Sequence, residues 1–278
     1  MMFESFKSRI IVAGHSNEKV KEFQDFKNGK NKSENTFVVE GVWCLDYLTK
    51  SKVEILSILF CEEYINNENT INIMSQLFQR DIEIIQVSKK VFDKLSTFDG
   101  PDGFMVMARF PKWDLDTMFQ KEDNHIVVLD GLETSGNIGT IIRAAEGFGV
   151  DAIFITNRKA KVTSTKTIKS AMGGCFFVPI IEWDDMKQCQ EWLKKHNFDI
   201  YLTDTRAEQR YYQASYKGNI AFVAGNERFG INRNWYQNTA KLISIPMLGY
   251  CDSLNVSVAT TIVMCEISMQ QHCKITSR

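Results

Sequence analysis

Apolar and polar residues alternate in blocks along the first hundred positions. The apolar runs 37–48, 55–61, 82–87 and 104–110 are typical of strands, whereas the more polar stretches near 70–80 and 89–95 are helix candidates. A GPDG turn at 100–103 precedes the last apolar run. Strands that alternate with helices in this way predict a small α/β unit.

A second series of the same kind starts at His125. Its strands are predicted at 126–129, 152–156, 176–180, 199–203, 220–224 and 242–246, with helices between most of them. Strands that are apolar throughout and joined by helices predict a mainly parallel sheet covered on both faces.

The stretch between the two series, WDLDTMFQKEDN, has little periodicity and carries four acidic residues. We therefore place the domain boundary there. The expected organisation is an N-terminal α/β domain over 1–112, a linker over 113–124 and a larger α/β domain over 125–278.

The charges of the 278-residue chain nearly cancel, with 33 Lys and Arg against 34 Asp and Glu. This balance predicts no general attraction to nucleic acid or anionic lipid, so any charge that binds RNA has to be local. An N-terminal arm with a modest basic excess includes Lys32. Two interpretations of the arm are about equally well supported: it contacts RNA phosphates, or it forms a solvated helix and a mobile loop.

A sharper basic segment runs from Thr156 to Ser170 and contains no acidic residue. Such a segment favours contact with RNA phosphates. Its basic side chains are Arg158, Lys159, Lys161, Lys166 and Lys169.

The 7 cysteines show no CxxC spacing, and the 4 histidines are isolated from one another. An odd number of scattered thiols is typical of reduced cysteines in a cytoplasm-like compartment, and we expect no metal. No window approaches the roughly 18 continuous apolar residues of a membrane helix. The apolar stretch that follows Arg9 is too short for a signal peptide.

Three glycine-containing segments of the second series follow predicted strands, where open α/β folds bind their ligands. The first, GNIGTIIRAAEGFGV at 136–150, predicts a helix that begins near Ile138 and points its positive end at a ligand. A simple tight turn between strand and helix explains the glycines as well. Arg143 is harder to explain, because an unpaired cation in an otherwise apolar helix would be costly.

The second segment, FVAGNERFGI at 222–231, has GxxxxG spacing without the Lys-Ser/Thr of a nucleotide P-loop. Its Gly-Asn-Glu turn either caps the next helix, with Glu227 in a structural role, or grips a ligand.

The third segment, 243–268, predicts a strand, a loop and a long helix. Ser253 and Asn255 place a hydroxyl and an amide at the start of this helix, where both are good caps. Apolar residues cover so much of the helix that more than one side should be buried. One side is expected to pack against the sheet of its own domain, and the other either against a second subunit or within the same chain. The two apolar stripes are Leu254, Val258, Ile262 and Met269, and Val256, Val263 and Ile267.

In order and spacing, NIGTIIRAA, GNERFGI and IPMLGYCDSLNVSVA resemble the three signature motifs of the SpoU (TrmH-type) RNA ribose 2′-O-methyltransferases of the SPOUT superfamily. VTSTKTIKSAMGGCFFVPI is similar to the corresponding stretch of the branch that includes thiostrepton-resistance ribosomal RNA methylases. The resemblance covers about residues 125–270. It implies a trefoil-knotted α/β domain that binds S-adenosylmethionine, forms a homodimer and methylates a ribose 2′-hydroxyl of RNA.

The resemblance also implies roles for individual residues. The residues expected at the S-adenosylmethionine site are Gly225, Ile245, Met247 and Leu254, and those expected in the catalytic region are Asn137, Arg143, Glu227, Ser253 and Asn255. Because arginine stays protonated to very high pH, Arg143 is expected to grip a phosphate and orient the hydroxyl rather than act as a base. Ser135 departs from the proline common in the family pattern, which should change loop stiffness more than chemistry.

The first domain is similar to the family's N-terminal RNA-binding domain through KVKEF, FVVEG and GPDGFMVMA. This resemblance favours ribosomal RNA, most of all that of the large subunit, over transfer RNA. Two alternatives stay open: a transfer RNA 2′-O-methyltransferase, and a non-catalytic RNA-binding scaffold that retains the fold. A Rossmann-type dehydrogenase ranks well below both, because GxGxxG and its acidic partner are missing.

Overall fold

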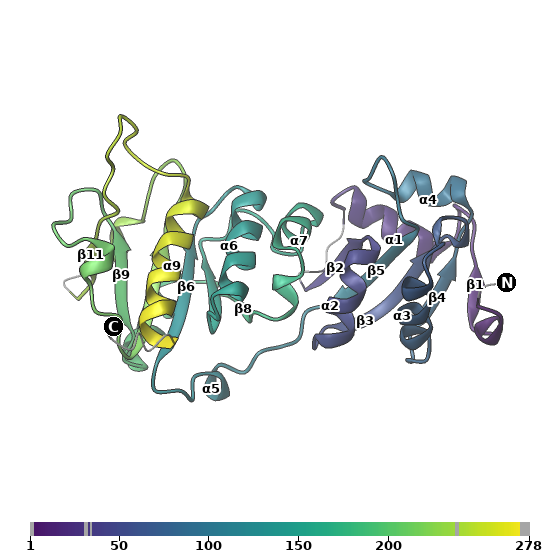
Figure 1. Cartoon of the computed structure of the whole chain (residues 1–278), viewed down its shortest axis with the longest axis horizontal. Helices are drawn as coiled ribbons and strands as arrows, with labels where there is room; N and C mark the ends of the chain where they lie inside the picture. Colours follow the sequence, from purple (N-terminus) through teal and green to yellow (C-terminus); the bar gives the residue numbers. More distant parts are fainter. Residues whose placement is uncertain (1–2, 31–32, 34, 237–238, 273–278) are drawn as a thin grey trace. The chain divides into compact units, whose positions relative to one another are not determined.

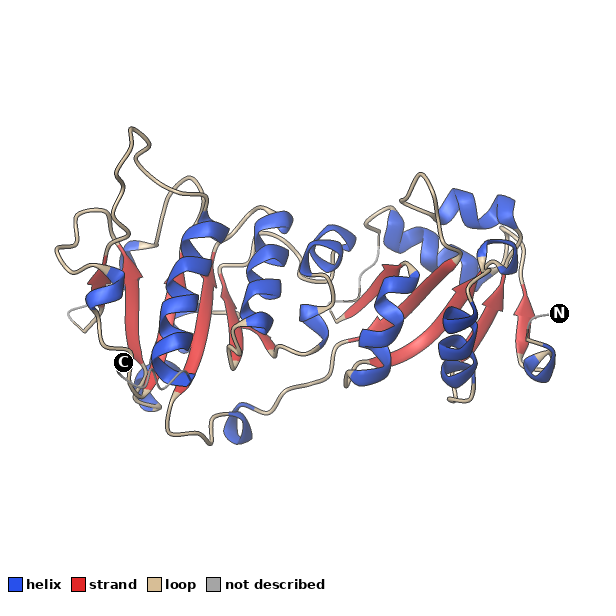
Figure 2. Cartoon of the chain, in the orientation of Figure 1, coloured by secondary structure: helices blue, strands red, loops and turns tan. Residues whose placement is uncertain are grey.

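The computed structural model describes residues 3–30, 33, 35–236 and 239–272. The chain divides into two compact units, of which one comprises Met1–Lys112 with Thr163–Lys169 and the other Trp113–Val162 with Ser170–Arg278. Each unit is built on a sheet of its own (Figures 1 and 2). The α/β class predicted for both halves of the sequence is therefore confirmed.

The sheet of the first unit has five strands in the order β1-β4-β3-β5-β2. β1, β4 and β3 are parallel, whereas β5 runs antiparallel to its neighbours β3 and β2. The apolar run 37–48 forms a strand only as far as Glu40, because Gly41 turns the chain with a φ of +113°. The strands are β1 (Ile10–Val12), β2 (Thr36–Glu40), β3 (Glu54–Phe60), β4 (Glu83–Gln86) and β5 (Phe104–Arg109).

Helices lie on both faces of this sheet. Val20 and Phe23 of one helix and Phe92 of another belong to a buried cluster with residues of β2 to β5. The helix predicted at 89–95 matches the structure, and the helix predicted near 70–80 begins two residues earlier, at Glu68. The helices are α1 (Glu18–Lys27), α2 (Leu45–Lys50), α3 (Glu68–Phe78) and α4 (Lys89–Leu95).

The sheet of the second unit has six strands in the order β11-β9-β10-β6-β7-β8, and every neighbouring pair is parallel. All residues of β6 are buried, as expected for a strand near the middle of a sheet that is covered on both faces. The strands are β6 (Asn124–Asp130), β7 (Ala152–Thr156), β8 (Ile180–Glu182), β9 (Asp199–Thr203), β10 (Asn219–Ala224) and β11 (Lys241–Ile243).

One face of this sheet packs against α8, whose Cys189 and Leu193 join a buried cluster with Ile126 and Val128 of β6. α6 and α9 pack side by side and cover the sheet elsewhere, lying in front of it in Figure 1. The helices of the second unit are α5 (Leu115–Met118), α6 (Ser135–Gly147), α8 (Met186–Lys195) and α9 (Val256–His272), and α7 (Thr165–Ala171) lies largely in the segment that belongs to the first unit.

The strand predicted at 176–180 is wrong for most of its length. The chain turns at Gly173, which has a φ of +85°, and forms a 3₁₀ helix over Gly174–Phe176. The amides of Phe176, Phe177 and Val178 donate to the carbonyls of Gly173 and Gly174, so these groups are not available to a sheet. Pro179 has no N–H, and β8 begins only at Ile180.

Among the residues that the structure describes, no helix is long and apolar enough to cross a membrane. The same residues contain no group of three or more His, Cys, Asp or Glu side chains placed to hold a metal ion.

Candidate active site

A cleft of about 800 Å³ opens at the carboxyl ends of β9, β10 and β11. Three connections form it: the residues that follow β9, the turn that follows β10, and the long loop between β11 and α9. Parallel strands place their carboxyl ends at one edge of the sheet, where the connecting loops form a crevice. The residues predicted at the cofactor site all line this cleft: Gly225, Ile245, Met247 and Leu254.

Gly225 lies where the chain folds back most tightly. A Cβ atom there would lie 2.5 Å from the carbonyl carbon of Gly230, so no larger residue fits without a shift of the backbone. Asn226 and Gly230 exchange two backbone hydrogen bonds of 3.0 and 2.9 Å across the turn. The Asn226 side chain also donates to the carbonyl of Gly131 at 2.7 Å, which attaches the turn to the end of β6. The turn is held by its own backbone and by a neighbouring strand.

Glu227 binds the start of α6. Its carboxylate accepts hydrogen bonds from the amides of Glu133 and Thr134, each at 3.1 Å, and from the Asn137 side chain at 3.0 Å. Partial burial opposes ionisation, but these hydrogen bonds outweigh it and lower the pKa of Glu227. Glu227 therefore does not cap the next helix along the chain, because its hydrogen bonds hold the start of α6.

Asn137 and Asn255 extend the hydrogen-bond chain from Glu227 to α9. The Asn255 side chain donates to the Asn137 carbonyl oxygen at 3.2 Å. Its own oxygen accepts from the Ser257 amide at 2.8 Å and from the Ser257 hydroxyl at 2.7 Å, which caps the helix. Glu227, Asn137 and Asn255, called the polar triad below, therefore join the turn after β10 to the starts of α6 and α9.

Ser253 lines the cleft with an exposed side chain, but it does not cap α9. The residue directly before the helix is Asn255, and the side chain of Ser253 lies too early in the chain for that position. Of the two caps predicted from the sequence, only Asn255 has that role.

Arg143 lies on α6 outside the residues that line the cleft, and its side chain is exposed. The expectation of a costly buried cation was wrong, because the helical pattern does not tell which side of α6 faces water. The helix also begins at Ser135 rather than near Ile138. Among the described residues, none forms a hydrogen bond or an ion pair with the guanidinium, which leaves it available to a ligand.

The basic segment predicted from Thr156 to Ser170 is divided between the two units, since Thr163–Lys169 belongs to the first. Arg158 forms a salt bridge of 2.8 Å with Glu182. The segment itself contains no acidic residue, but the fold brings a carboxylate from β8 next to it. Lys159, Lys161, Lys166 and Lys169 have exposed side chains. Lys32 lies outside the described residues.

Sequence reasoning missed an ion pair at the cleft. Asp204 and Arg206, just after β9, line it and form two side-chain hydrogen bonds of 3.2 Å. The hydrogen bonds from Arg206 lower the pKa of the Asp204 carboxyl. The signal was present, because charged residues directly follow a predicted strand at the edge where ligands bind.

Residues 124–265, more than half of the chain, match the SpoU rRNA Methylase family, and residues 17–106 match the MRM3-like substrate binding domain. The chain is 32% identical over 205 residues to a protein of Pasteurella multocida named 23S rRNA (guanosine-2'-O-)-methyltransferase RlmB, covering 72% of this chain and 84% of that one. It is 26% identical over 254 residues to 23S rRNA (guanosine(2553)-2'-O)-methyltransferase RlmP of Bacillus subtilis, covering 91% of this chain and 97% of that one.

The fold is similar to that of an AdoMet-bound rRNA methyltransferase from Sinorhizobium meliloti, with a TM-score of 0.83 and 22% identity over 94% of this chain and 98% of that one. The chain belongs to the SpoU rRNA methylase family.

Proposed function

We propose that this protein transfers a methyl group from S-adenosylmethionine to a ribose 2′-hydroxyl of RNA, and that its substrate is ribosomal RNA of the large subunit. The observation that carries the proposal is the cleft at the carboxyl ends of β9, β10 and β11, where two lining residues, Glu227 and Asn255, are joined through Asn137 of α6. Membership of the family and the names of both relatives support the reaction and the class of RNA.

The cleft suits a cofactor with an apolar ring system and a positive charge. Ile245, Met247 and Leu254 offer apolar contacts. Its charged side chains are three carboxylates and one guanidinium, an excess of negative charge that complements a sulfonium: Asp204, Glu227, Asp252 and Arg206. At its base the buried hydroxyl of Thr260 has no hydrogen-bond partner among the described residues.

The bound cofactor supplies a methyl group already activated by a positive sulfur. The protein therefore has to align the ribose oxygen with that methyl group and assist the departure of the hydroxyl proton. The polar triad joins two of the connections that form the cleft to the start of α6, and the exposed hydroxyl of Ser253 lines the same cleft. Arg143 grips the phosphate of the target nucleotide, since a free guanidinium is a strong anion ligand and a poor base.

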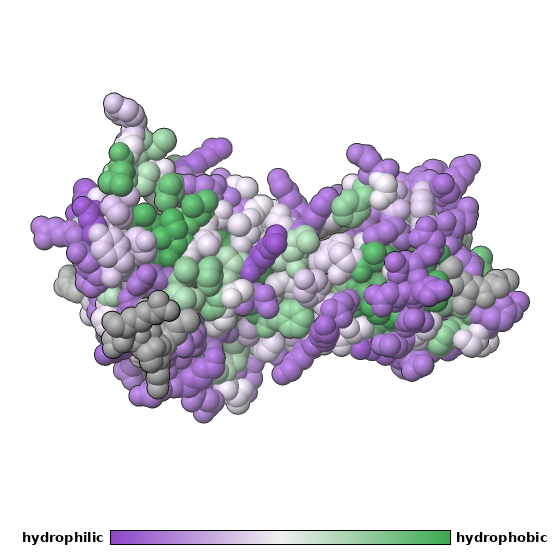
Figure 3. Space-filling model, viewed as in Figure 1, coloured by the Kyte–Doolittle hydropathy of each residue, from purple (hydrophilic) through white to green (hydrophobic). Residues whose placement is uncertain are grey.

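The protein works as a homodimer through the outer side of α9. Val263, Met264 and Ile267 are buried against the sheet, whereas Val258 is 48% exposed and Met269 37% exposed. Figure 3 shows hydrophobic side chains gathered over α9 and the loop above it, where Leu248 is 99% exposed. A contiguous exposed apolar patch of this kind is typical of an interface. Because α6 packs beside α9, a partner bound there lies next to Arg143.

We also propose that the second unit contains a trefoil knot, as the resemblance to the family implies. β11 is the edge strand beside β9, but α9 packs against β6 and β10 in the middle of the sheet. The chain must therefore cross back over the ends of the strands between Ser244 and Asn255. We include this knotted threading in the proposal.

The two domains divide the work. Residues 1–112 recognise RNA, residues 113–124 link the domains, and residues 125–278 carry out methyl transfer; the two family matches, 17–106 and 124–265, support this division. Lys159, Lys161, Lys166 and Lys169 contribute phosphate contacts, as does Lys32 in the arm. The six cysteines of the described residues are all free thiols, which supports a cytoplasmic location.

The test is a methyl-transfer assay with isotope-labelled S-adenosylmethionine and unmodified 23S ribosomal RNA, 16S ribosomal RNA or bulk transfer RNA. We expect label in 23S RNA, located at a 2′-O-methylated nucleotide by mapping. Label in transfer RNA alone would assign the substrate to the other class. Calorimetry of S-adenosylmethionine binding separates an enzyme from a scaffold, since a scaffold that neither binds the cofactor nor transfers methyl would overturn the proposal.

A further inference from the structure

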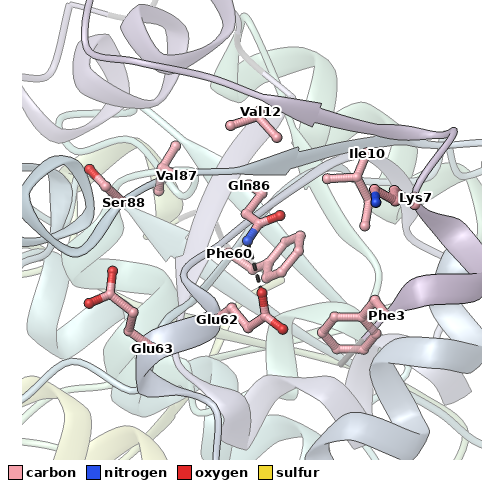
Figure 4. Close-up of a pocket in the computed structure, with 10 residues that line it drawn as sticks. All are labelled: Phe3, Lys7, Ile10, Val12, Phe60, Glu62, Glu63, Gln86, Val87 and Ser88. Atoms are coloured by element: carbon pink, nitrogen blue, oxygen red, sulfur yellow. Dashed lines mark hydrogen bonds between the residues drawn. The ribbon is translucent and has the colours of Figure 1, made fainter. Parts of the chain in front are cut away.

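A second cavity, of about 540 Å³, lies in the first unit, far in sequence from the methyl-transfer motifs (Figure 4). It opens at the carboxyl ends of the three parallel strands β1, β3 and β4. Its volume falls within the range of small-molecule sites, about 300–1,000 Å³. The lining residues are Phe3, Lys7, Ile10, Val12, Phe60, Glu62, Glu63, Gln86, Val87 and Ser88.

One side of the cavity is apolar. Phe3, Phe60 and Val87 are buried and form its floor, and the rings of Phe3 and Phe60 meet edge to face at 5.4 Å. Val12 at the rim is 80% exposed on the edge strand of the sheet. An apolar floor with an aromatic ring accommodates the flat face of a planar ring.

The other side is acidic. The Gln86 side chain donates to the Glu62 carboxylate at 3.0 Å, as the dashed line in Figure 4 shows. Glu63 is exposed, and one of its oxygens accepts from the backbone amide of Lys89 at 3.1 Å. That bond fixes the carboxylate at the cavity and uses one lone pair of one oxygen, so both oxygens can still accept a hydrogen bond from a ligand.

Basic side chains lie at the cavity and close to it in sequence. Among the described residues, Lys7 is the one basic residue of the lining, opposite Ser88 in Figure 4, and its Nζ lies 3.7 Å from a carboxylate oxygen of Glu4. Lys89 and Lys90 directly follow Ser88. All three lysines are exposed. Acceptors inside and cations at the rim match a ligand that carries N–H donors on a ring and a phosphate beyond it.

We propose that this cavity binds an unpaired guanine of the RNA, with the ring against the apolar floor and the Glu63 carboxylate as acceptor for its N–H groups. This inference rests on the proposed function, in which the first unit recognises RNA, and it names the base that this unit would bind. Specific RNA readers take unstacked bases in this manner, through stacking and contacts to the Watson–Crick edge.

The acceptor chemistry selects guanine among the four bases. Guanine presents two adjacent N–H donors on its Watson–Crick edge, which fit one ionised carboxylate. Adenine and cytosine place a ring nitrogen acceptor beside their amino group, and uracil places its single N–H between two carbonyls. Each of these would turn an acceptor toward the carboxylate, which has no proton to donate.

The experiment is calorimetric titration of the full chain with guanosine, inosine or adenosine 5′-monophosphate, without RNA or S-adenosylmethionine. We expect guanosine monophosphate to bind about tenfold more tightly than adenosine monophosphate, because only guanine offers two N–H donors to the charged carboxylate. Inosine monophosphate, which lacks the amino group, should fall between them. Equal affinity for all three nucleotides, or binding of none, overturns the proposal.

Two variants locate the site. Glu63→Gln keeps an oxygen for the Lys89 amide but turns an NH₂ group toward the ligand, so the preference for guanine should disappear. Val12→Glu places a charge over the apolar floor and should weaken the binding of all three nucleotides. Val12→Thr, which has the same shape as valine, should leave their affinities unchanged. The matched control is Glu68→Gln, an exposed carboxylate of the same unit outside the cavity.

A nucleotide bound in the methyl-transfer cleft instead would give the opposite pattern. Binding that is lost in Leu254→Arg but retained in Glu63→Gln and Val12→Glu overturns the assignment to this cavity. The titration contains neither cofactor nor RNA, so its outcome is independent of whether the second unit transfers a methyl group.

Discussion

Asn137 at the start of α6 donates a hydrogen bond of 3.0 Å to Glu227 in the turn after β10, across 90 residues of sequence. Through Asn137, two residues that line the cleft, Glu227 and Asn255, are joined by hydrogen bonds. The motifs that contain these residues are separate in the chain, and the structure shows that they act on one another.

Replacement of Glu227 with Gln tests the polar triad. A neutral amide has one oxygen for three donors, so the loops lose part of their support. We expect the rate of methyl transfer to fall about tenfold to a hundredfold, because hydrogen bonds to a charged group are worth about 1.5–3 kcal/mol. Single-turnover rates at saturating cofactor and RNA measure this. Glu146→Gln, an exposed carboxylate on α6, is the control, and equal rates in both variants would count against the role of Glu227.

Arg143→Ala and Arg143→Lys test the phosphate contact. Since Arg143 is exposed, neither change should alter the melting temperature. We expect the KM for RNA to rise and S-adenosylmethionine binding to stay unchanged, with Lys recovering only part of the loss because it lacks the planar fork. Wild-type methylation by Arg143→Lys would remove the case for a bidentate contact. Lys195→Ala, an exposed cation on α8, is the matched control.

Gly225→Ala tests the tight turn at the cleft. The new methyl group meets the backbone of Gly230 and Ile231, so the turn has to move. We expect a loss of about 1–3 kcal/mol in the free energy of unfolding and a weaker affinity for S-adenosylmethionine. Urea unfolding and calorimetry measure the two effects. A Cβ on Gly147 meets no atom within 4 Å, so Gly147→Ala should be neutral or slightly stabilising.

Val258→Asp tests the dimer. A carboxylate in the middle of the outer stripe of α9 would have to be buried without a partner on association. We expect the variant to be monomeric by light scattering and to lose most of its methyl-transfer activity, with the far-ultraviolet circular dichroism unchanged. Val12→Asp places the same charge on an exposed valine of the first unit and should leave the mass unchanged. A wild-type mass for Val258→Asp would place the interface elsewhere.

His125 predicts a dependence of stability on pH. Burial lowers its pKa from 6.5 to about 3, and neither ring nitrogen has a hydrogen-bond partner among the described residues. Between these values the unfolded chain binds a proton that the folded protein does not. The free energy of unfolding should therefore decrease as the pH falls below about 6.5, by up to about 1.4 kcal/mol per pH unit.

His125→Phe should flatten the dependence between pH 6.5 and pH 4 in urea titrations. The exposed His15→Phe should not change it. An unchanged slope in His125→Phe would assign the acid sensitivity to other groups.

The sequence predicted the two α/β units and the residues at the cleft because both leave local signals. Glycines and amide side chains after predicted strands marked the segments, and the resemblance to the family's motifs assigned Gly225 and Leu254 within them. Features set by three-dimensional neighbours were missed. The exposure of Arg143 depends on which side of α6 meets the sheet, and the salt bridge of Arg158 depends on a glutamate 24 residues away. The apolar run 176–180 favours a strand, but the turn at Gly173 leads into a 3₁₀ helix, so most of that strand does not form.

The bond between Asn137 and Asn255 joins residues 118 positions apart. During synthesis the start of α6 leaves the ribosome long before α9, so the cleft cannot close until α9 has emerged and packed. A nascent chain therefore lacks the complete polar triad until the start of α9 has been synthesised.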